Sequence, residues 1–334
     1  MNRVLVTGAT GFIGTHLVRA LRRAGASVAA LDLDVSKAGS PADGVEWIQG
    51  DIFDAARLAS AARGADTVIH LVAKTHDFSA GEDREDEYRR INVTGTRNLL
   101  EACDREAVRH VVYFSSVKAM TEEAEGILDE SCPPQPTTAY GRTKLEAEEA
   151  LRQFGLEHGV RTTTLRFPLV YGPGNKGNVY RMIEAVDRGR FVVIGRGDNR
   201  RSMVYVENVV EATLAVAGRR DLPGDTYIVT DGTDYSVREL YEAIARGLGR
   251  RPLPFGLPLF AAKLLARMGD AGGRITGRTL PFNTGALSKL TGELRISPER
   301  LRRDAGFVPR HRLPDAIGET IRWYRTVSGR VGKP

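Results

Sequence analysis

Residues 3–14 read Arg-Val-Leu-Val-Thr-Gly-Ala-Thr-Gly-Phe-Ile-Gly, and this stretch decides the fold class. An apolar run suited to a buried strand leads directly into three glycines, Gly8, Gly11 and Gly14, and the amphipathic pattern of Ile13–Ala24 follows. A glycine at such a turn lets the backbone approach a pyrophosphate, and the helix behind it presents free N–H groups and the positive end of its dipole. The stretch therefore predicts a strand–loop–helix unit that binds a dinucleotide.

The same alternation of short β-branched runs and amphipathic stretches continues over the first two-thirds of the chain. Near-continuous apolar strands indicate burial on both faces, so we expect an α/β fold, a doubly wound parallel sheet covered by helices. The expected strands are Val4–Thr7, Val28–Asp32, Val45–Gln49, Thr67–Leu71, Val111–Ser115, Thr162–Phe167 and Tyr227–Thr230. The expected helices between them are Ile13–Ala24, Arg57–Arg63, Arg89–Arg105 and Thr138–Phe154.

The alternation of strand-like and helix-like segments becomes irregular after Tyr171. We expect a Rossmann domain from residues 1–171, to which 207–231 return, and a smaller substrate-binding lobe from 172–206 and 232–334. The elements expected between the two parts are a turn at Gly172–Gly174, a helix over Val179–Arg188, and strands over Phe191–Ile194 and Met203–Val206.

Asp32 closes the expected second strand, 18 residues after Gly14. A carboxylate at this place accepts hydrogen bonds from both hydroxyls of the adenine ribose and repels a 2′-phosphate. Leu33 and Asp34 follow it, so no arginine stands there to favour the phosphate. The sequence therefore predicts NAD as cofactor in preference to NADP.

The composition excludes several classes of protein. The chain has 334 residues, 42% of them hydrophobic, and its longest apolar runs are far shorter than the roughly 18 residues that span a bilayer. The strand-like run from Arg3 leaves no room for a signal peptide, and Cys103 and Cys132 have no metal-ligand spacing. We expect a cytoplasmic protein with no metal site and no stable membrane insertion.

The charge of the chain is unevenly distributed. Residues 237–334 hold 19 Lys and Arg against eight Asp and Glu, a balance of +11, whereas the whole chain carries +6. We interpret this basic segment as a solvated face and expect no nucleic-acid partner, because no aromatic-interleaved basic patch accompanies it. Within it, the apolar stretch Phe255–Met268 predicts a buried packing helix, with a substrate lid or a shallow membrane-contact helix as alternatives.

Tyr140 and Lys144 are four residues apart and share one face of an expected helix. A phenol is a poor base at neutral pH, and both a neighbouring ammonium and the positive charge of an oxidised nicotinamide favour its ionisation. Ser115 and Ser116 end the preceding strand, at the edge of the sheet where doubly wound folds bind ligands. A serine hydroxyl there can hydrogen-bond the oxygen that gains or loses a proton, so the three residue types together indicate proton and hydride transfer.

Taken together, these motifs resemble the extended short-chain dehydrogenase/reductases, and within them the NAD-dependent nucleotide-sugar epimerases and dehydratases. The resemblance covers almost the whole chain. The motifs on which it rests are Gly8–Gly14, Asp32, Asp51-Ile52, His70–Ala73, Asn92–Thr96, Phe114–Ser116, Tyr140–Lys144, Tyr171–Gly174 and Arg201–Asn208.

The resemblance implies a role for each matching residue. Ser116, Tyr140 and Lys144 would carry the chemistry, and Lys144 would also hold the nicotinamide ribose. The NAD site would comprise Gly8, Gly11, Phe12, Ile13, Gly14, Asp32, Asp51, Ile52, Leu71, Ala73, Asn92, Ser115, Tyr140, Lys144 and Phe167, with Phe167 near the nicotinamide. The substrate would meet Lys118, Asn178 and Arg201, the last through its diphosphate, which suits an arginine fork.

Two departures from the family pattern matter. Leu169 stands where many members have a diphosphate-binding Asn, and Asn178 or Lys176 would have to substitute for it. Val117 and Lys118 follow Ser116, where dehydratases carry acidic residues. Since loss of a C6 hydroxyl needs an acid, 4,6-dehydration is not expected. We interpret His76 as a plain loop residue, with contact to a hexose as the alternative.

The function predicted from the sequence is 4-epimerisation of a UDP-hexose through a transient 4-keto sugar. A 4-keto-sugar reductase using the same three residues is the alternative, and a hydroxysteroid dehydrogenase is a distant third. An NAD-binding regulator without activity is disfavoured by the intact Ser-Tyr-Lys set. The resemblance also implies a homodimer through a four-helix interface, for which we expect an apolar seam of Leu99, Leu100, Cys103, Leu145 and Leu151.

Overall fold

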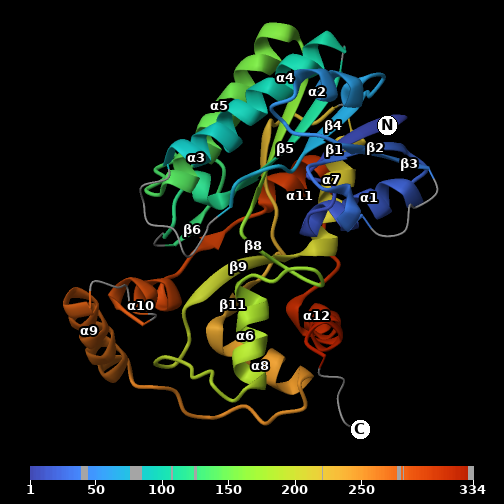
Figure 1. Ribbon diagram of the computed structural model, residues 1–334. Coiled ribbons are helices and arrows are strands. Elements are labelled where there is room, and N and C mark those ends of the chain that lie inside the picture. Colours follow the sequence, from blue (N-terminus) through green and yellow to red (C-terminus); the bar gives the residue numbers. More distant parts are fainter. Residues whose placement is uncertain are drawn as a thin grey trace.

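The computed structural model describes residues 1–38, 44–75, 85–106, 108–123, 126–219, 221–276, 280 and 282–329, and Figure 1 shows two parts of unequal size. The larger part is built on a seven-stranded sheet of order β10-β7-β5-β4-β1-β2-β3 in which every paired strand is parallel. This confirms the doubly wound α/β fold. Its strands are β1 (Arg3–Thr7), β2 (Ser27–Asp32), β3 (Val45–Gln49), β4 (Thr67–His70), β5 (His110–Ser116), β7 (Arg161–Phe167) and β10 (Thr226–Ile228).

Helices cover both faces of this sheet because its strands are apolar on both sides. In β1, Val4 and Val6 face a core shared with α1 (Phe12–Arg23) and α7 (Val206–Ala217). Leu5, between them, points to the opposite core. The helices on that second face are α2 (Ala55–Ala62), α4 (Gly95–Arg105) and α5 (Ala139–His158).

The helical segment before β5 is interrupted. The sequence predicted one helix over Arg89–Arg105, but the structure has α3 (Glu85–Arg89), a π-helical turn (Arg90–Thr94) and then α4. Such turns widen a helix locally and are frequent at functional sites. Here the turn contains Asn92, one of the expected cofactor residues.

The smaller part contains a three-stranded sheet of order β11-β9-β8. Its strands are β8 (Leu169–Tyr171), β9 (Arg200–Tyr205) and β11 (Asp234–Ser236). Against them pack α6 (Asn178–Asp187), α8 (Val237–Gly247) and α12 (Leu313–Val327), which share one apolar core.

The expected strand over Phe191–Ile194 is wrong. Only Ile194 pairs, in an isolated bridge to Leu257, and the chain then turns through Gly195 and Gly197 with positive φ. Val193 is buried in the core of the smaller part, so this segment contributes apolar side chains to the core without pairing as a strand.

Several short elements lie outside the two larger sheets. β6 (Ile127–Leu128) pairs with β12 (Arg295–Ile296), which lies much later in the chain, and a 3₁₀ turn (Val117–Ala119) follows β5. Another 3₁₀ turn (Val35–Lys37) follows β2. After β12, α11 (Glu299–Ala305) returns to the main sheet, where it contacts β10; Figure 1 shows α11 beside the larger part.

The apolar stretch within the basic segment is not a buried packing helix. It forms most of α9 (Leu259–Thr276), which packs on α10 (Thr284–Thr291) through the small residues Ala262 and Ala266. Its large side chains are on the outside, with Phe260 77% exposed. The expectation failed because small residues, not large ones, form the inner face of this helix.

The expected dimer seam is also wrong in its residues. Leu99, Leu100, Cys103 and Leu151 are buried within the protomer, between α4, α5 and the sheet, and only Leu145 is partly exposed. Side chains that complete the core of one protomer are unavailable to a second copy. Among the described residues, no helix has the length and apolar character needed to cross a bilayer.

Candidate active site

The glycine loop connects β1 to α1 in the way that its sequence predicts. Gly8 has φ +73°, and its N–H donates to the carbonyl of Leu31 at 2.9 Å. A Cβ on Gly14 would lie 2.2 Å from the carbonyl oxygen of Gly8, so only glycine permits this close approach of the helix to the loop. The N-cap of α1 is Gly11, which has no side chain to accept from the first turn of the helix, and this leaves the N–H groups of that turn to an anion.

Asp32 lies at the end of β2 beside this loop. Its Oδ2 accepts a hydrogen bond from the N–H of Thr10 at 2.9 Å, and its Oδ1 accepts one from the N–H of Leu33 at 2.8 Å. The carboxylate is therefore fixed against the glycine loop, which orients it for the ribose hydroxyls that the sequence predicts.

The other expected cofactor residues gather around the same edge of the sheet. Gly8 approaches the backbone of Leu71, which follows β4 together with Ala73. The side chain of Ile52 is buried against Gly95, where a Cβ would meet it at 2.2 Å. Asp51 begins the turn before Ile52 and accepts from the N–H of Phe53.

Asn92 connects this edge to α5. Its Oδ1 accepts from the N–H of Lys74 at 2.7 Å, and its Nδ2 donates to the hydroxyl of Thr143 at 3.1 Å. Thr143 precedes Lys144, so the buried amide of Asn92 helps to fix the helix that carries the expected catalytic pair.

Ser116 and Tyr140 are brought together by the contact between two backbone segments. The hydroxyl of Tyr140 is hydrogen-bonded to Ser116, and Ser116 also accepts from the N–H of Lys118 at 3.2 Å. Gly141 allows this approach, because a Cβ there would lie 2.3 Å from the carbonyl oxygen of Lys118.

Glu122 holds the same two segments together, and no pattern in the sequence pointed to it. Its carboxylate accepts hydrogen bonds from the N–H and hydroxyl groups of both Thr137 and Thr138, at 2.6–3.1 Å. Thr138 is in turn the N-cap of α5, with its hydroxyl accepting from Gly141. These bonds hold the pKa of the Glu122 carboxyl below its usual range, although burial opposes them.

Lys144 is buried below Tyr140 on α5. Its ammonium donates to the carbonyl of Phe114 at 2.6 Å and lies 4.0 Å from the centre of the Tyr113 ring. Burial lowers the pKa of Lys144 to about 7, and the carboxylate of Glu148 opposes this shift. Glu148 itself forms a buried ion pair with Arg166, with Oε2 and Nη2 2.6 Å apart. Glu148 is four residues after Lys144, and this helical spacing was the sequence signal that could have identified it.

The electrostatics of Tyr140 differ from the sequence prediction. Burial raises the pKa of Tyr140 to about 12, and the hydrogen bond to Ser116 opposes this shift. The protein without cofactor therefore keeps the phenol protonated. The positive charge of an oxidised nicotinamide is the remaining predicted influence that favours the phenolate.

The nicotinamide end of the expected cofactor site lies where β5 and β7 end. Ser116 is paired with Phe167, whose ring is 4.8 Å from that of Phe114. Ser115 Oγ is buried there and has no hydrogen-bond partner in the part of the chain that the structure describes. This unpartnered hydroxyl and the open glycine loop both fit a bound dinucleotide.

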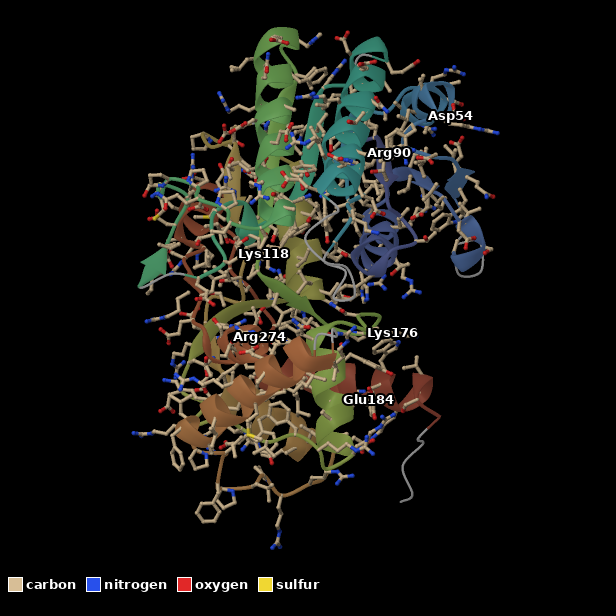
Figure 2. The ribbon with its side chains drawn as sticks, turned by 60° about the vertical axis from the view of Figure 1, so that its left-hand side comes forward. Asp54, Arg90, Lys118, Lys176, Glu184 and Arg274 are labelled. Carbon is tan, nitrogen blue, oxygen red and sulfur yellow. The ribbon has the colours of Figure 1, made fainter. Side chains whose placement is uncertain are left out.

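The expected substrate residues are on two sides of the junction between the parts. Figure 2 places Lys118 at the lower edge of the larger part and Lys176 on the smaller one. Asn178 is exposed at the first position of α6. Arg201 lies on β9, where its Nε donates to the carbonyl of Gly292 at 3.0 Å. Burial lowers the pKa of Arg201, and the carboxylate of Glu123 opposes this shift.

Two further expectations concern residues outside or beside this site. His76 lies outside the described residues. Within the described residues, no group of three or more His, Cys, Asp or Glu side chains is placed to hold a metal ion.

Known proteins are similar to this chain in sequence and in fold. The model of the NAD dependent epimerase/dehydratase family matches residues 4–230, which is more than half of the chain. The N-acetyl-alpha-D-glucosaminyl-diphospho-ditrans,octacis-undecaprenol 4-epimerase of Escherichia coli O157:H7 is 28% identical over 96% of this chain and 95% of its own. The UDP-glucose 4-epimerase of Vibrio cholerae is 26% identical over 98% of this chain and 97% of its own.

Solved structures agree with these relatives. MoeE5 in complex with UDP-glucuronic acid and NAD superposes with a TM-score of 0.76 at 29% identity, over 98% of this chain and all of that one. The UDP-glucose 4-epimerase of Thermus thermophilus in complex with NAD has a TM-score of 0.76 at 26% identity, over 97% of this chain and 99% of that one.

Proposed function

The chain belongs to the NAD dependent epimerase/dehydratase family, and we propose that it interconverts the C4 epimers of a nucleotide-activated hexose, most simply a UDP-sugar. The observation that carries this proposal is the placement of Ser116, Tyr140 and Lys144 at the carboxyl edge of the sheet, beside the glycine loop. The relatives and solved structures that are UDP-sugar 4-epimerases support the choice of reaction.

We assign the cofactor and the substrate to different parts of the chain. Residues 1–171 and 207–231 would hold NAD, through the glycine loop and Asp32. Residues 172–206 and 232–334 would hold the sugar nucleotide, with Arg201 and Asn178 toward its diphosphate and Lys118 facing them from the larger part. Bound NAD supplies the acceptor and donor of hydride through which C4 becomes a ketone and is reduced on its opposite face.

Side chains of the site would transfer the proton of the C4 hydroxyl. Tyr140 would take this proton as C4 is oxidised and return it as C4 is reduced, while Ser116 hydrogen-bonds the same oxygen. Lys144, fixed by the carbonyl of Phe114, would hold the nicotinamide ribose. The lack of a carboxylate after Ser116 is consistent with epimerisation rather than dehydration.

NMR of the sugars tests this proposal. Purified protein with catalytic NAD should interconvert UDP-glucose or UDP-N-acetylglucosamine with its C4 epimer. The alternative, a 4-keto-sugar reductase, predicts that none interconverts and that a UDP-4-keto-6-deoxy sugar is consumed with stoichiometric oxidation of NADH.

A lipid-linked substrate is a second candidate, and one observation favours it. The E. coli O157:H7 relative is named for a sugar carried on diphospho-undecaprenol, and the exposed apolar side chains of α9 give this chain a surface suited to lipid. The same NMR assay with a polyprenyl-diphosphate N-acetylhexosamine in detergent separates the two, because a UDP-sugar enzyme leaves that compound unchanged.

We further propose a cytoplasmic homodimer that pairs the outward faces of α4 and α5. These faces carry charges of both signs, among them Arg97, Glu101, Glu149 and Arg152, so two copies related by a two-fold axis can match opposite charges. Light scattering at micromolar concentration tests the dimer, and a monomer there would contradict it.

A further inference from the structure

The outer face of α9 is an apolar stripe. Phe260, Leu264, Met268 and Ala271 follow one another at helical spacing, so they share one face of the helix. The first three are 77%, 61% and 61% exposed. Figure 2, in which the left-hand side of Figure 1 comes forward, shows α9 crossing the front of the smaller part.

This outer face is not required by the core of the protein. The opposite side of α9 presents Ala262 and Ala266, which are buried against Leu287 of α10 and partly buried Phe282. Gly269 allows the closest approach, since a Cβ there would lie 1.9 Å from the carbonyl oxygen of Phe282. Small residues thus pack one side of the helix on the protein, while the large apolar side chains on the other side are exposed and can contact another surface.

A basic edge accompanies the apolar stripe. Lys263, Arg267 and Arg274 are exposed and lie side by side along α9, next to the stripe. The only acidic residue in residues 251–276 is Asp270, whose carboxylate accepts from the N–H of Thr284. The exposed surface of α9 therefore combines apolar and positive side chains with no exposed carboxylate.

The segment before α9 continues this character. Leu253 and Phe255 are exposed, Phe255 at 83%, and Arg251 beside them is exposed as well. The exposed apolar side chains of 253–268 thus form a run along one stretch of chain. Exposed apolar patches of this kind mark interaction surfaces.

We propose that α9 binds the surface of an anionic phospholipid bilayer, with its apolar stripe among the acyl chains nearest the headgroups and its basic edge against the phosphates. A helix with Phe and Leu on one side and Lys and Arg beside them lies in such an interface without crossing it. The proposal goes beyond the proposed function and does not depend on which sugar is bound.

Charge decides between a bilayer and a second copy of the chain. In an antiparallel two-fold pair of α9 helices packed stripe against stripe, the two basic edges would lie on the same side, and Lys263 and Arg267 would meet like charges. An anionic bilayer instead offers opposite charge along the whole edge. The net charge of +11 over residues 237–334 also favours binding to an anionic surface.

Docking through α9 would also orient the active site. α10, on which α9 packs, donates a hydrogen bond from Ser288 to the carboxylate of Glu123, on the segment that follows Ser116. Asn199, which precedes β9, donates to the carbonyl of Leu290 near the end of α10. The two helices are thus attached to both parts of the chain next to the site.

Sedimentation with vesicles tests the apolar stripe. The protein should sediment with vesicles of phosphatidylethanolamine and phosphatidylglycerol and remain in solution with phosphatidylcholine alone. The double variant Phe260→Asn/Leu264→Asn should lose at least about tenfold in partition. The matched control, Val308→Asn/Val327→Asn, removes exposed apolar side chains elsewhere and should sediment like the unmodified protein.

The basic edge is tested separately. Lys263→Glu/Arg267→Glu should abolish binding to the anionic vesicles, whereas Arg19→Glu/Arg109→Glu, with the same change in net charge, should retain most of it. Added salt should weaken the binding of the unmodified protein. An unchanged thermal unfolding midpoint shows that each variant is folded.

Three results would overturn the proposal. The first is unmodified protein that stays in solution with anionic vesicles, and the second is equal loss in the α9 variants and their controls. The third is a change in oligomeric state of the Phe260→Asn/Leu264→Asn variant without a change in vesicle binding, which would assign the stripe to a second copy.

Discussion

The carbonyl oxygen of Lys118 occupies the space into which a side chain on Gly141 would project, with only 2.3 Å between that oxygen and a Cβ. Through this contact the turn after Ser116 lies directly against the helix of Tyr140, and the two hydroxyl groups are hydrogen-bonded. The active site thus depends on a residue that has no functional group. Glu122 reinforces the contact through its hydrogen bonds to Thr137 and Thr138.

Gly141→Ala should therefore separate Tyr140 from Ser116 and lower kcat about a hundredfold, because small displacements of catalytic groups are costly. Binding of NAD should change little. Gly318→Ala in α12 is the matched control, since its Cβ would meet only the end of Arg322 at 3.7 Å. Steady-state kinetics of both variants check this, and equal activity would show that the contact does not position the site.

Tyr140→Phe should remove proton transfer and lower the rate of epimerisation by about 10²–10⁴-fold. Titration with NAD should give nearly the affinity of the unmodified protein, because the phenol oxygen serves the substrate. A variant that loses NAD binding along with the rate would show that the phenol oxygen is needed for cofactor affinity, which would contradict this prediction.

Asp32→Ala should weaken NAD binding and reduce the discrimination against NADP. The structure adds a second effect, because Asp32 also accepts from the N–H of Thr10 and so holds the glycine loop. Asp32→Asn keeps an oxygen for Thr10 but loses the negative charge, so it should lose discrimination with a smaller loss of NAD affinity. Titrations with both dinucleotides separate these effects. Tighter binding of NADPH than NADH by the unmodified protein would refute the role of Asp32.

The stability of the protein should fall in mild acid because of two buried histidines. Burial lowers the pKa of His70 to about 3 and that of His110 to about 4, against a usual value of 6.5. Both histidines therefore bind protons more readily in the unfolded chain than in the folded protein. Their contribution to the free energy of unfolding is complete above pH 6.5 and is lost as the pH falls toward 3. At pH 5 the loss from His70 alone is on the order of 2 kcal/mol.

Urea unfolding at pH 7 and pH 5 measures this loss. His70→Gln should show a smaller difference between the two pH values than the unmodified protein, whatever its stability at pH 7, and His110→Gln should behave alike. The same difference in all three proteins would mean that other groups cause the acid sensitivity.

The sequence alone predicted the features that depend on local pattern. Apolar strands separated by amphipathic helices are sufficient for a doubly wound sheet, and its parallel strands bring Ser116, Asp32 and the glycine loop to one edge. Helical spacing likewise placed Tyr140 and Lys144 on the same face of α5. These predictions need only the periods of the helix and the strand and the direction of the strands.

Tertiary structure alone decided which apolar side chains face the core and which polar groups meet. Leu99 and Phe260 look equally suited to burial in the sequence, yet Leu99 is fully buried and Phe260 is largely exposed. The difference arises because α4 packs its large residues on a sheet, whereas α9 packs on α10 through small ones. Hydrogen bonds of Glu122 and the pKa of Lys144 likewise depend on groups far apart in sequence, and a local pattern contains no information about the distance between them.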